Sequence, residues 1–166
     1  MLEFEVAGPY SVRRKKMPKG KIIDENSLSE LWEKVGDVRH EKGIYVFGIR
    51  AGKGFTPYYV GKTNNRFENE CSNSHKLNVY KTALMFGNGR PVIFFLVQKN
   101  ETKRINNDKK LRRVERFFIQ IAYNKNKDLL NKHGIKGDNW SIKGVINSSQ
   151  GKPSKASQKF KTLMGL

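Results

Sequence analysis

The chain has 166 residues, of which 37% are hydrophobic and 11% aromatic, a composition that excludes a disordered chain and a length that suits one domain. Lysine and arginine outnumber aspartate and glutamate 33 to 15, which gives a formal net charge of +18. Such an excess repels itself in a compact fold, so we expect a polyanionic partner, with nucleic acid ahead of an anionic membrane surface.

The single cysteine, Cys71, excludes a disulfide framework and a cysteine zinc site. The first residues, MLEFEVAG, carry acids where a signal peptide needs lysines. No apolar stretch approaches the roughly 18 residues that a membrane span needs. We therefore expect a cytoplasmic protein without a membrane partner.

The first 40 residues are predicted to form short strands and one helix. Residues 2–24 alternate between apolar and polar types, which is typical of strands, and Gly8-Pro9 and Pro18 mark turns. Asn26 or Ser27 is expected to cap the helix, which ends near Gly36. The strands border a basic edge made of Arg13, Arg14, Lys15 and Lys16. The helix has apolar positions at Leu28, Leu31, Trp32 and Val35.

The next segment reads as a hairpin followed by two helices. Strands are predicted at 43–50 and 57–62, joined by the glycine-rich loop AGKGFTP. A short helix is expected within 64–72. A second helix is expected to end at Gly87 and Gly89, and its apolar positions are Leu77, Tyr80, Ala83 and Leu84.

The second half of the chain is predicted to begin with a buried strand at 91–98, where the sequence is almost continuously apolar. A charged loop, ETKRINND, follows, and residues 109–124 show the clearest helical period in the chain. Residues 139–146 read as a further strand. The last dozen residues are expected to form a basic helix that uses Phe160, Leu163 and Met164.

Together these elements predict an α+β fold with a small central, largely antiparallel sheet flanked by helices and extra strands at the N-terminus. We expect one domain over residues 1–166. Within it, residues 41–135 form the core, 1–40 the N-terminal strands and helix, and 136–166 a C-terminal strand and basic helix.

One carboxylate stands out on the helix at 109–124. At about 100° per residue, the arginines fall mostly opposite the apolar residues. Glu115 lies instead at the margin of the apolar sector. An inward carboxylate is costly unless it is paired or binds a metal, so a buried ion pair and a metal ligand are the two interpretations. The apolar face consists of Leu111, Val114, Phe117, Phe118, Ile121 and Ala122.

The two strand motifs of the hairpin, Gly43-Ile44-Tyr45 and Tyr59-Val60-Gly61, resemble those of the GIY-YIG nuclease family, with valine for isoleucine in the second. Lys62 and Arg66 follow them. The family pattern continues with a glutamate on a later helix and an asparagine downstream, where Glu115 and Asn131 stand. The resemblance spans roughly residues 43–131.

One position departs from the family pattern. Arg66 lies closer to Tyr59 than the family's arginine usually does, and Asn69 stands nearer the usual place. Lys62 or Arg90 is the alternative cation.

The resemblance implies a metal-dependent DNA endonuclease that hydrolyses phosphodiester bonds. Tyr45 is expected to position the attacking water and take its proton, with Lys62, Arg66 and the metal favouring its phenolate. Tyr59 would complete the hydrogen-bond network and Arg66 would clamp the phosphate. Glu115 would bind Mg²⁺, or another divalent cation such as Mn²⁺.

Two further residues have open interpretations. His75 is either an auxiliary base or phosphate ligand, or an ordinary surface histidine. Asn131 either orients Glu115 near the metal or caps a turn.

Double-stranded DNA is the expected partner. The basic residues expected to touch its phosphates without reading sequence are Arg13, Arg14, Lys15, Lys16, Arg112 and Arg116. The main alternative function is a catalytically inactive nucleic-acid-binding module on the same fold, in which the tyrosines only pack across the hairpin. A structural role in a nucleoprotein assembly is a further alternative. Restriction, repair, recombination and mobile-element functions are all compatible with the sequence.

Overall fold

The computed structural model describes residues 3–18, 20–99, 104–131 and 154–164. The chain divides into two compact units, residues 1–132 and 133–166. The prediction of one domain over the whole chain stays a prediction. Within the described ranges, no helix has both the length and the apolar character needed to cross a membrane.

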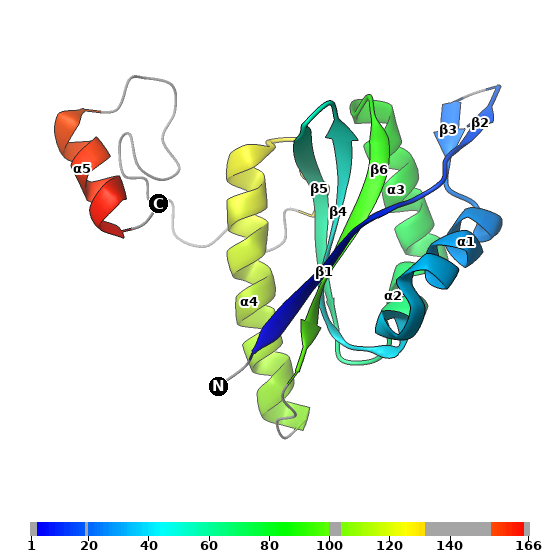
Figure 1. The fold of residues 1–166 in the computed structure, drawn as a ribbon, viewed down its shortest axis with the longest axis horizontal. Coiled ribbons are helices and arrows are strands. Elements are labelled where there is room, and N and C mark those ends of the chain that lie inside the picture. Colours follow the sequence, from blue (N-terminus) through cyan, green and yellow to red (C-terminus); the bar gives the residue numbers. More distant parts are fainter. Residues whose placement is uncertain (1–2, 19, 100–103, 132–153, 165–166) are drawn as a thin grey trace. The chain divides into compact units, whose positions relative to one another are not determined.

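The first unit is built on a four-stranded sheet in which every neighbouring pair is antiparallel (Figure 1). Its strand order is β1 (Phe4–Ser11), β6 (Arg90–Gln98), β4 (Gly43–Ala51) and β5 (Gly54–Thr63). A separate two-stranded sheet pairs β2 (Lys15–Met17) with β3 (Gly20–Ile22). The predicted α+β fold, with an antiparallel sheet flanked by helices and extra N-terminal strands, is confirmed.

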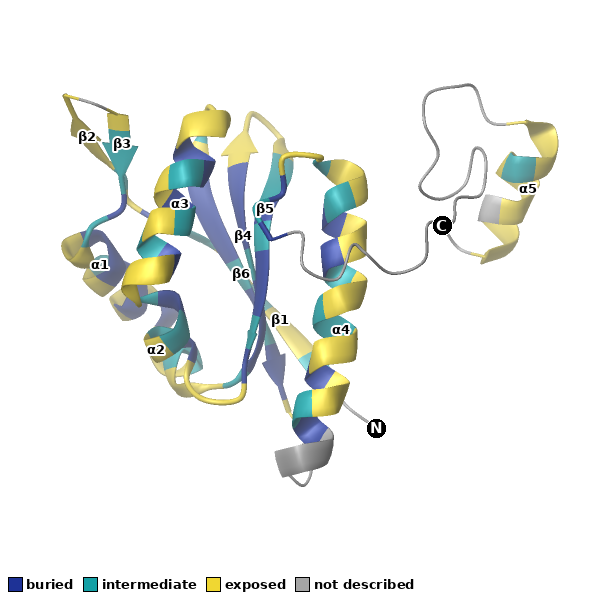
Figure 2. Ribbon diagram, turned by 180° about the vertical axis from the view of Figure 1, so that it is seen from behind, coloured by how far each residue is buried: buried dark blue, intermediate teal, exposed yellow. Residues whose placement is uncertain are grey.

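Helices cover the two faces of the sheet unequally. One face carries α1 (Glu25–Val35), the short 3-10 helix η1 (Gly36–His40), α2 (Phe67–Cys71) and α3 (Ser74–Phe86), whereas α4 (Arg104–Lys125) lies on the other (Figures 1 and 2). Strand β5 forms an edge of the sheet next to β4. Residues of both faces can therefore meet around this edge.

The predicted cap of α1 is wrong. Asp24 is the N-cap, and its carboxylate accepts hydrogen bonds from the backbone N–H of Ser27 at 2.9 Å and from the Ser27 hydroxyl at 2.7 Å. Ser27 is buried in the first turn, so its hydroxyl supports the cap from inside the helix. The predicted apolar positions of this helix are all buried: Leu28, Leu31, Trp32 and Val35.

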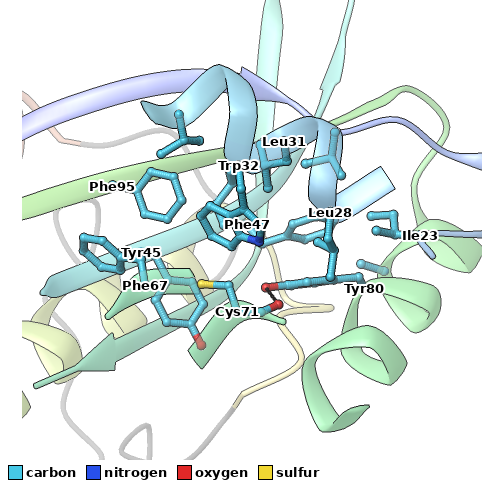
Figure 3. Packing of buried hydrophobic residues seen from close by; sticks show 14 of the residues in the cluster. Ile23, Leu28, Leu31, Trp32, Tyr45, Phe47, Phe67, Cys71, Tyr80 and Phe95 are labelled. Atoms are coloured by element: carbon cyan, nitrogen blue, oxygen red, sulfur yellow. Dashed lines mark hydrogen bonds between the residues drawn. The ribbon is translucent and has the colours of Figure 1, made fainter. Parts of the chain in front are cut away.

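The main core lies between the sheet and helices α1 to α3 (Figure 3). Strand alternation places Tyr45, Phe47 and Ile49 of β4 in it. Phe95 of β6 packs against Phe67 with ring centroids 4.7 Å apart. The predicted helix that ends at Gly87 is confirmed as α3, since the Gly87 N–H bonds to the carbonyl of Ala83.

Helix α4 begins earlier than predicted and packs through a different face. It starts at Arg104, inside the segment expected to be a loop. Leu111, Ile119 and Ala122 are buried, whereas Phe117 is 58% and Ile121 47% exposed. A single helix that packs against a sheet buries only a narrow stripe of its surface. Here the buried stripe includes Ile119 in place of the predicted Phe117 and Ile121, and the half-buried Glu115 lies along it.

The second unit contains α5 (Lys155–Met164), which confirms the predicted C-terminal helix. Its predicted apolar residues are exposed: Phe160, Leu163 and Met164. The strand predicted at 139–146 lies outside the described residues.

Candidate functional site

The hairpin of β4 and β5 brings the two motif tyrosines together. The antiparallel register sets Tyr45 opposite Gly61 and Phe47 opposite Tyr59. The rings of Tyr45 and Tyr59 stack with centroids 6.0 Å apart and an interplanar angle of 29°. Tyr45 is fully buried and Tyr59 half-buried, so one phenol belongs to the core while the other reaches toward the surface.

The two motif glycines permit this close packing. Gly43 has φ of 146°, and a Cβ there would lie 2.0 Å from the carbonyl oxygen of Leu96 on β6. A Cβ at Gly61 would lie 2.4 Å from the hydroxyl of Tyr45. Glycine is therefore a geometric requirement at Gly43 for the close pairing of β4 with β6, and at Gly61 for seating the Tyr45 ring against β5.

A polar network joins the two phenols through residues that the sequence did not single out. The Tyr45 hydroxyl donates to Glu70 Oε1 at 3.2 Å. Lys76 Nζ lies 3.1 Å from the same oxygen and donates to the Tyr59 hydroxyl at 2.8 Å. Lys76 is only 7% exposed, and it lies along the buried face of α3 with Tyr80 and Ala83. The i, i+4, i+7 spacing of these residues is the signal that would have marked Lys76 as inward-facing.

The expectation that Lys62 and Arg66 favour the phenolate of Tyr45 is wrong, and the effect of the metal stays a prediction. Burial is the main cause that raises the pKa of Tyr45 far above its ordinary value, and Cys71, Tyr80, Tyr59 and Glu70 raise it further. Tyr45 therefore stays a neutral donor to Glu70. Its ring packs edge-on against Phe67, whose centroid is 6.5 Å away (Figure 3).

Lys62 turns toward α4 and contacts Asp108 there. Its Nζ lies 2.7 Å from Asp108 Oδ1, which also accepts from Asn64 Nδ2 at 2.6 Å. Arg112 Nε donates to the other oxygen of Asp108 at 2.7 Å. The hydrogen bond from Lys62 is the main cause that lowers the pKa of Asp108 to about 2.

Glu115 follows Asp108 two turns later on α4, half-buried. Within the described ranges its carboxylate makes no hydrogen bond or ion pair. Burial raises the pKa of Glu115, and the charges of Lys62, Lys76 and Arg112 partly counteract this, while Glu70 raises it further. The carboxylate of Glu115 is thus within electrostatic range of both Lys62 with its partner Asp108 and the tyrosine network, which consists of Tyr45, Tyr59, Glu70 and Lys76.

The metal predicted at Glu115 is compatible with this chemistry. Across the part of the chain that the structure describes, no group of three or more histidine, cysteine, aspartate or glutamate residues could hold a metal ion. Mg²⁺ does not need such a group, because it keeps several waters and is commonly held by one or two carboxylates and substrate phosphates. A half-buried carboxylate that has no cationic partner among the described residues fits that role.

Arg66 and His75 lie apart from the tyrosine network. Arg66 is the exposed N-cap of α2, and His75 is exposed in the first turn of α3. Among the described residues, no hydrogen bond or ion pair joins either of them to Tyr45 or Glu115. The alternative cation, Arg90, lies on β6 opposite Arg50 in the strand register. Arg50 is at the opposite end of β4 from Tyr45.

Asn131 contacts the backbone of the hairpin. Its side-chain oxygen accepts from the Val60 N–H at 3.1 Å, and its amide nitrogen donates to the Val60 carbonyl. Asn131 is 9% exposed. It therefore fixes the chain that follows α4 to β5, next to Gly61.

The predicted DNA-contacting residues lie in two groups. Those near β2 are on the side of the sheet that carries α1, whereas those of α4 are on the other side (Figures 1 and 2). Arg13 pairs with Glu30, Arg14 donates to the Gly89 carbonyl, and Lys15 lies 3.8 Å from Asp24. Lys16 and Arg116 are exposed.

Comparison of the chain with protein-family models, with curated proteins and with solved structures finds no match. The resemblance to the GIY-YIG nucleases therefore rests on the two strand motifs and on the residues that follow them. The candidate site consists of Tyr45, Tyr59, Glu70 and Lys76 on one side of β5 and Lys62, Asp108 and Glu115 on the other.

Proposed function

We propose that the protein is a metal-dependent DNA endonuclease of the GIY-YIG type that hydrolyses phosphodiester bonds. The observation that carries the proposal is Glu115, a half-buried carboxylate that has no ion pair among the described residues although three cations influence it. A structural carboxylate in such surroundings is expected to be paired. An unpaired one is suited to bind a cation that completes its coordination with waters and substrate phosphate oxygens.

The surrounding residues suit an anionic transition state. Mg²⁺ bound at Glu115 would supply positive charge at the developing oxyanion. Lys76 holds its ammonium group against the Tyr59 hydroxyl, which fixes a cation and a donor together at the edge of β5. Lys62 would exchange Asp108 for a phosphate oxygen, and the net charge of +18 would favour binding of the DNA backbone.

A catalytically inactive nucleic-acid-binding module is the second candidate function. The position of Arg66 favours it, since this exposed residue makes no contact with the tyrosine network in the described chain. This candidate requires DNA binding that falls with salt and no cleavage with any divalent metal.

Cleavage of supercoiled plasmid DNA separates the two functions. The wild-type chain is expected to nick the plasmid with Mg²⁺ or Mn²⁺ but not with EDTA. Glu115→Gln is expected to lower the rate roughly 100-fold or more, because metal-ion stabilisation of a transition state is worth several kcal/mol. The control Glu33→Gln changes an exposed glutamate of α1 and is expected to leave the rate unchanged.

Thermal unfolding provides a readout of metal binding that does not depend on cleavage. Mg²⁺ is expected to raise the melting temperature of the wild-type chain and of Glu33→Gln, but not that of Glu115→Gln, because a ligand that binds only the native state stabilises it. DNA binding without cleavage by the wild-type chain, under every metal tried, would overturn the nuclease proposal.

A further inference from the structure

The hydroxyl of Tyr45 is buried, and its hydrogen-bond partner is Glu70. Tyr45 is 0% exposed, and its hydroxyl lies against the backbone at Gly61. A phenol sealed in this way does not touch a water that arrives from solvent. The hydroxyl donates its proton to Glu70 Oε1, so the hydrogen bond leads outward from the core to this carboxylate.

Glu70 is both oriented and accessible. Its Oε1 receives Tyr45 Oη at 3.2 Å and Lys76 Nζ at 3.1 Å. These contacts leave Oε2 without a partner in the described part of the chain, and the side chain is 31% exposed. One oxygen is thus fixed by two donors from β4 and α3, while the other is free to accept a proton.

The position of Glu70 also links it to Glu115. The charge of Glu70 contributes to the raised pKa of Glu115, so the two carboxylates lie within electrostatic range of each other. A pair of carboxylates, one holding a cation and one accepting a proton, is a common division of roles in hydrolysis.

We propose that Glu70 is the general base of this site, with Tyr45 and Lys76 as positioning residues that hold its carboxylate. The inference rests on the proposed nuclease function. The water oxygen forms a bond to phosphorus as one of its protons passes to Glu70 Oε2. The bond from phosphorus to the leaving oxygen breaks, and that oxygen takes a proton from solvent. Glu70 then returns its proton to solvent.

A simpler reading is that Glu70 only neutralises Lys76, whose ammonium group is almost completely buried. A neutralising role requires one ion pair and no second donor. The hydrogen bond from Tyr45 is additional to it, and it orients the carboxylate in a way that charge balance alone does not need. The two readings differ in what happens to the rate and its pH dependence when Glu70 loses its charge.

The test compares Glu70→Gln, Tyr45→Phe and the control Glu68→Gln in single-turnover cleavage of plasmid DNA with Mg²⁺ across pH 5 to 9. Glu68 shares helix α2 with Glu70, and its Oε2 lies 3.7 Å from His40 Nδ1. In the described part of the chain it makes no hydrogen bond to Tyr45 or Tyr59. The groups whose charge influences or is influenced by Glu70 are Tyr45 of β4, Lys76 and Tyr80 of α3, Cys71 of α2 and Glu115 of α4.

Glu70→Gln is expected to lower the cleavage rate about 10²- to 10⁴-fold, with DNA affinity retained. It is also expected to make the decline of the rate on the acidic side shallower, because one of the two carboxylates that must be ionised is removed. Tyr45→Phe is expected to lower the rate less and to keep that decline, because Glu70 is still present. Glu68→Gln is expected to behave as the wild type. If Tyr45 were the base, Tyr45→Phe would lose more activity than Glu70→Gln, and the proposal would be wrong.

A rate and pH profile of Glu70→Gln equal to the wild type would overturn the inference while leaving the nuclease proposal intact. If Glu70→Gln lowered only the melting temperature and preserved the rate, Glu70 would have the neutralising role, and the general-base proposal would be overturned as well. A wild-type chain that cleaves no DNA would overturn both proposals together. Circular dichroism of each variant verifies folding. If Glu70→Gln does not fold, Tyr45→Phe still provides a test, because it retains the Glu70–Lys76 ion pair.

Discussion

The two faces of the sheet differ in how tightly they are covered. Helices α1 to α3 close one face over a core of buried aromatic rings, whereas α4 is the helix on the other face among the described residues of the first unit (Figure 2). On the α4 side an apolar cavity of about 220 Å³ remains, lined by residues that include Val60, Phe94 and Phe118. The closed face fixes Tyr45, and the open face presents Glu115. The proposed site lies at β5, where the buried half with Tyr45 and the more exposed half with Glu115 meet.

The largest expected difference between the faces is in packing energy. Phe95→Ala removes a fully buried ring that packs against Tyr10, Trp32 and Phe67. We expect it to lower the free energy of unfolding by roughly 3–5 kcal/mol. The matched change Phe117→Ala, at a residue 58% exposed on α4, is expected to change it by less than about 0.5 kcal/mol. Urea denaturation measures both, and similar losses would show that the two faces are equally packed.

A smaller loss is expected where the motif glycine meets Tyr45. Gly61→Ala places a methyl group 2.4 Å from the Tyr45 hydroxyl, and Tyr45 is buried and has no room to move. The cost is roughly 1–3 kcal/mol of unfolding free energy, as for other overpacked cores. At Gly54, a Cβ meets only the Ala51 carbonyl oxygen at 3.7 Å, so Gly54→Ala is the control. Equal melting temperatures for the two variants would contradict the tight seat of Tyr45.

The carboxylates of α4 should respond to pH in opposite directions. The folded-state pKa of Asp108 is lowered to about 2 from 3.8, so its contribution to stability is present above about pH 3.8 and is lost as the pH falls toward 2. Asp108→Asn should therefore be less stable than the wild type at pH 5, with the difference shrinking at lower pH. Urea midpoints from pH 5 to 2.5 measure this, with Asp37→Asn, at an exposed position of η1, as the control. A difference that does not change with pH would contradict it.

Glu115 gives the smallest and opposite effect. Burial raises its folded-state pKa, so the native state binds a proton more tightly than the unfolded chain does. The wild type should lose stability as the pH rises above the ordinary value of 4.5 and through the folded-state pKa. Without divalent metal, Glu115→Gln should therefore gain in melting temperature relative to the wild type between pH 4 and 8. A constant difference across this range would show that Glu115 is not destabilised by burial.

The fold was predictable where apolar period and turn residues agree. The strands of the hairpin, the buried strand β6 and helix α3 follow from such patterns. The packed face of α4 was not predictable in this way, because a broad apolar stripe in the sequence does not show how much of the helix the sheet covers. Phe117 and Ile121 are apolar yet exposed for this reason.

The site was only partly predictable. The motifs predicted that Tyr45 and Tyr59 lie close together, and their rings do stack. The charge state of Tyr45 was not predictable from the motifs, because it depends on the burial of the phenol, which no local sequence pattern indicates. Glu70 and Lys76 come from two helices and meet between the tyrosines, and such a meeting depends on how the helices dock.

The Asn131 side chain has a consequence beyond the site. Its amide group accepts from the N–H and donates to the carbonyl of Val60, and the Leu130 N–H donates to the Tyr58 carbonyl at 2.8 Å. These are the bonds that a neighbouring strand would make. An outer strand with free backbone groups invites another molecule to add to the sheet and begin aggregation. Residues 130 and 131 occupy these groups on β5, so two copies of the protein cannot join their sheets at Tyr58 and Val60.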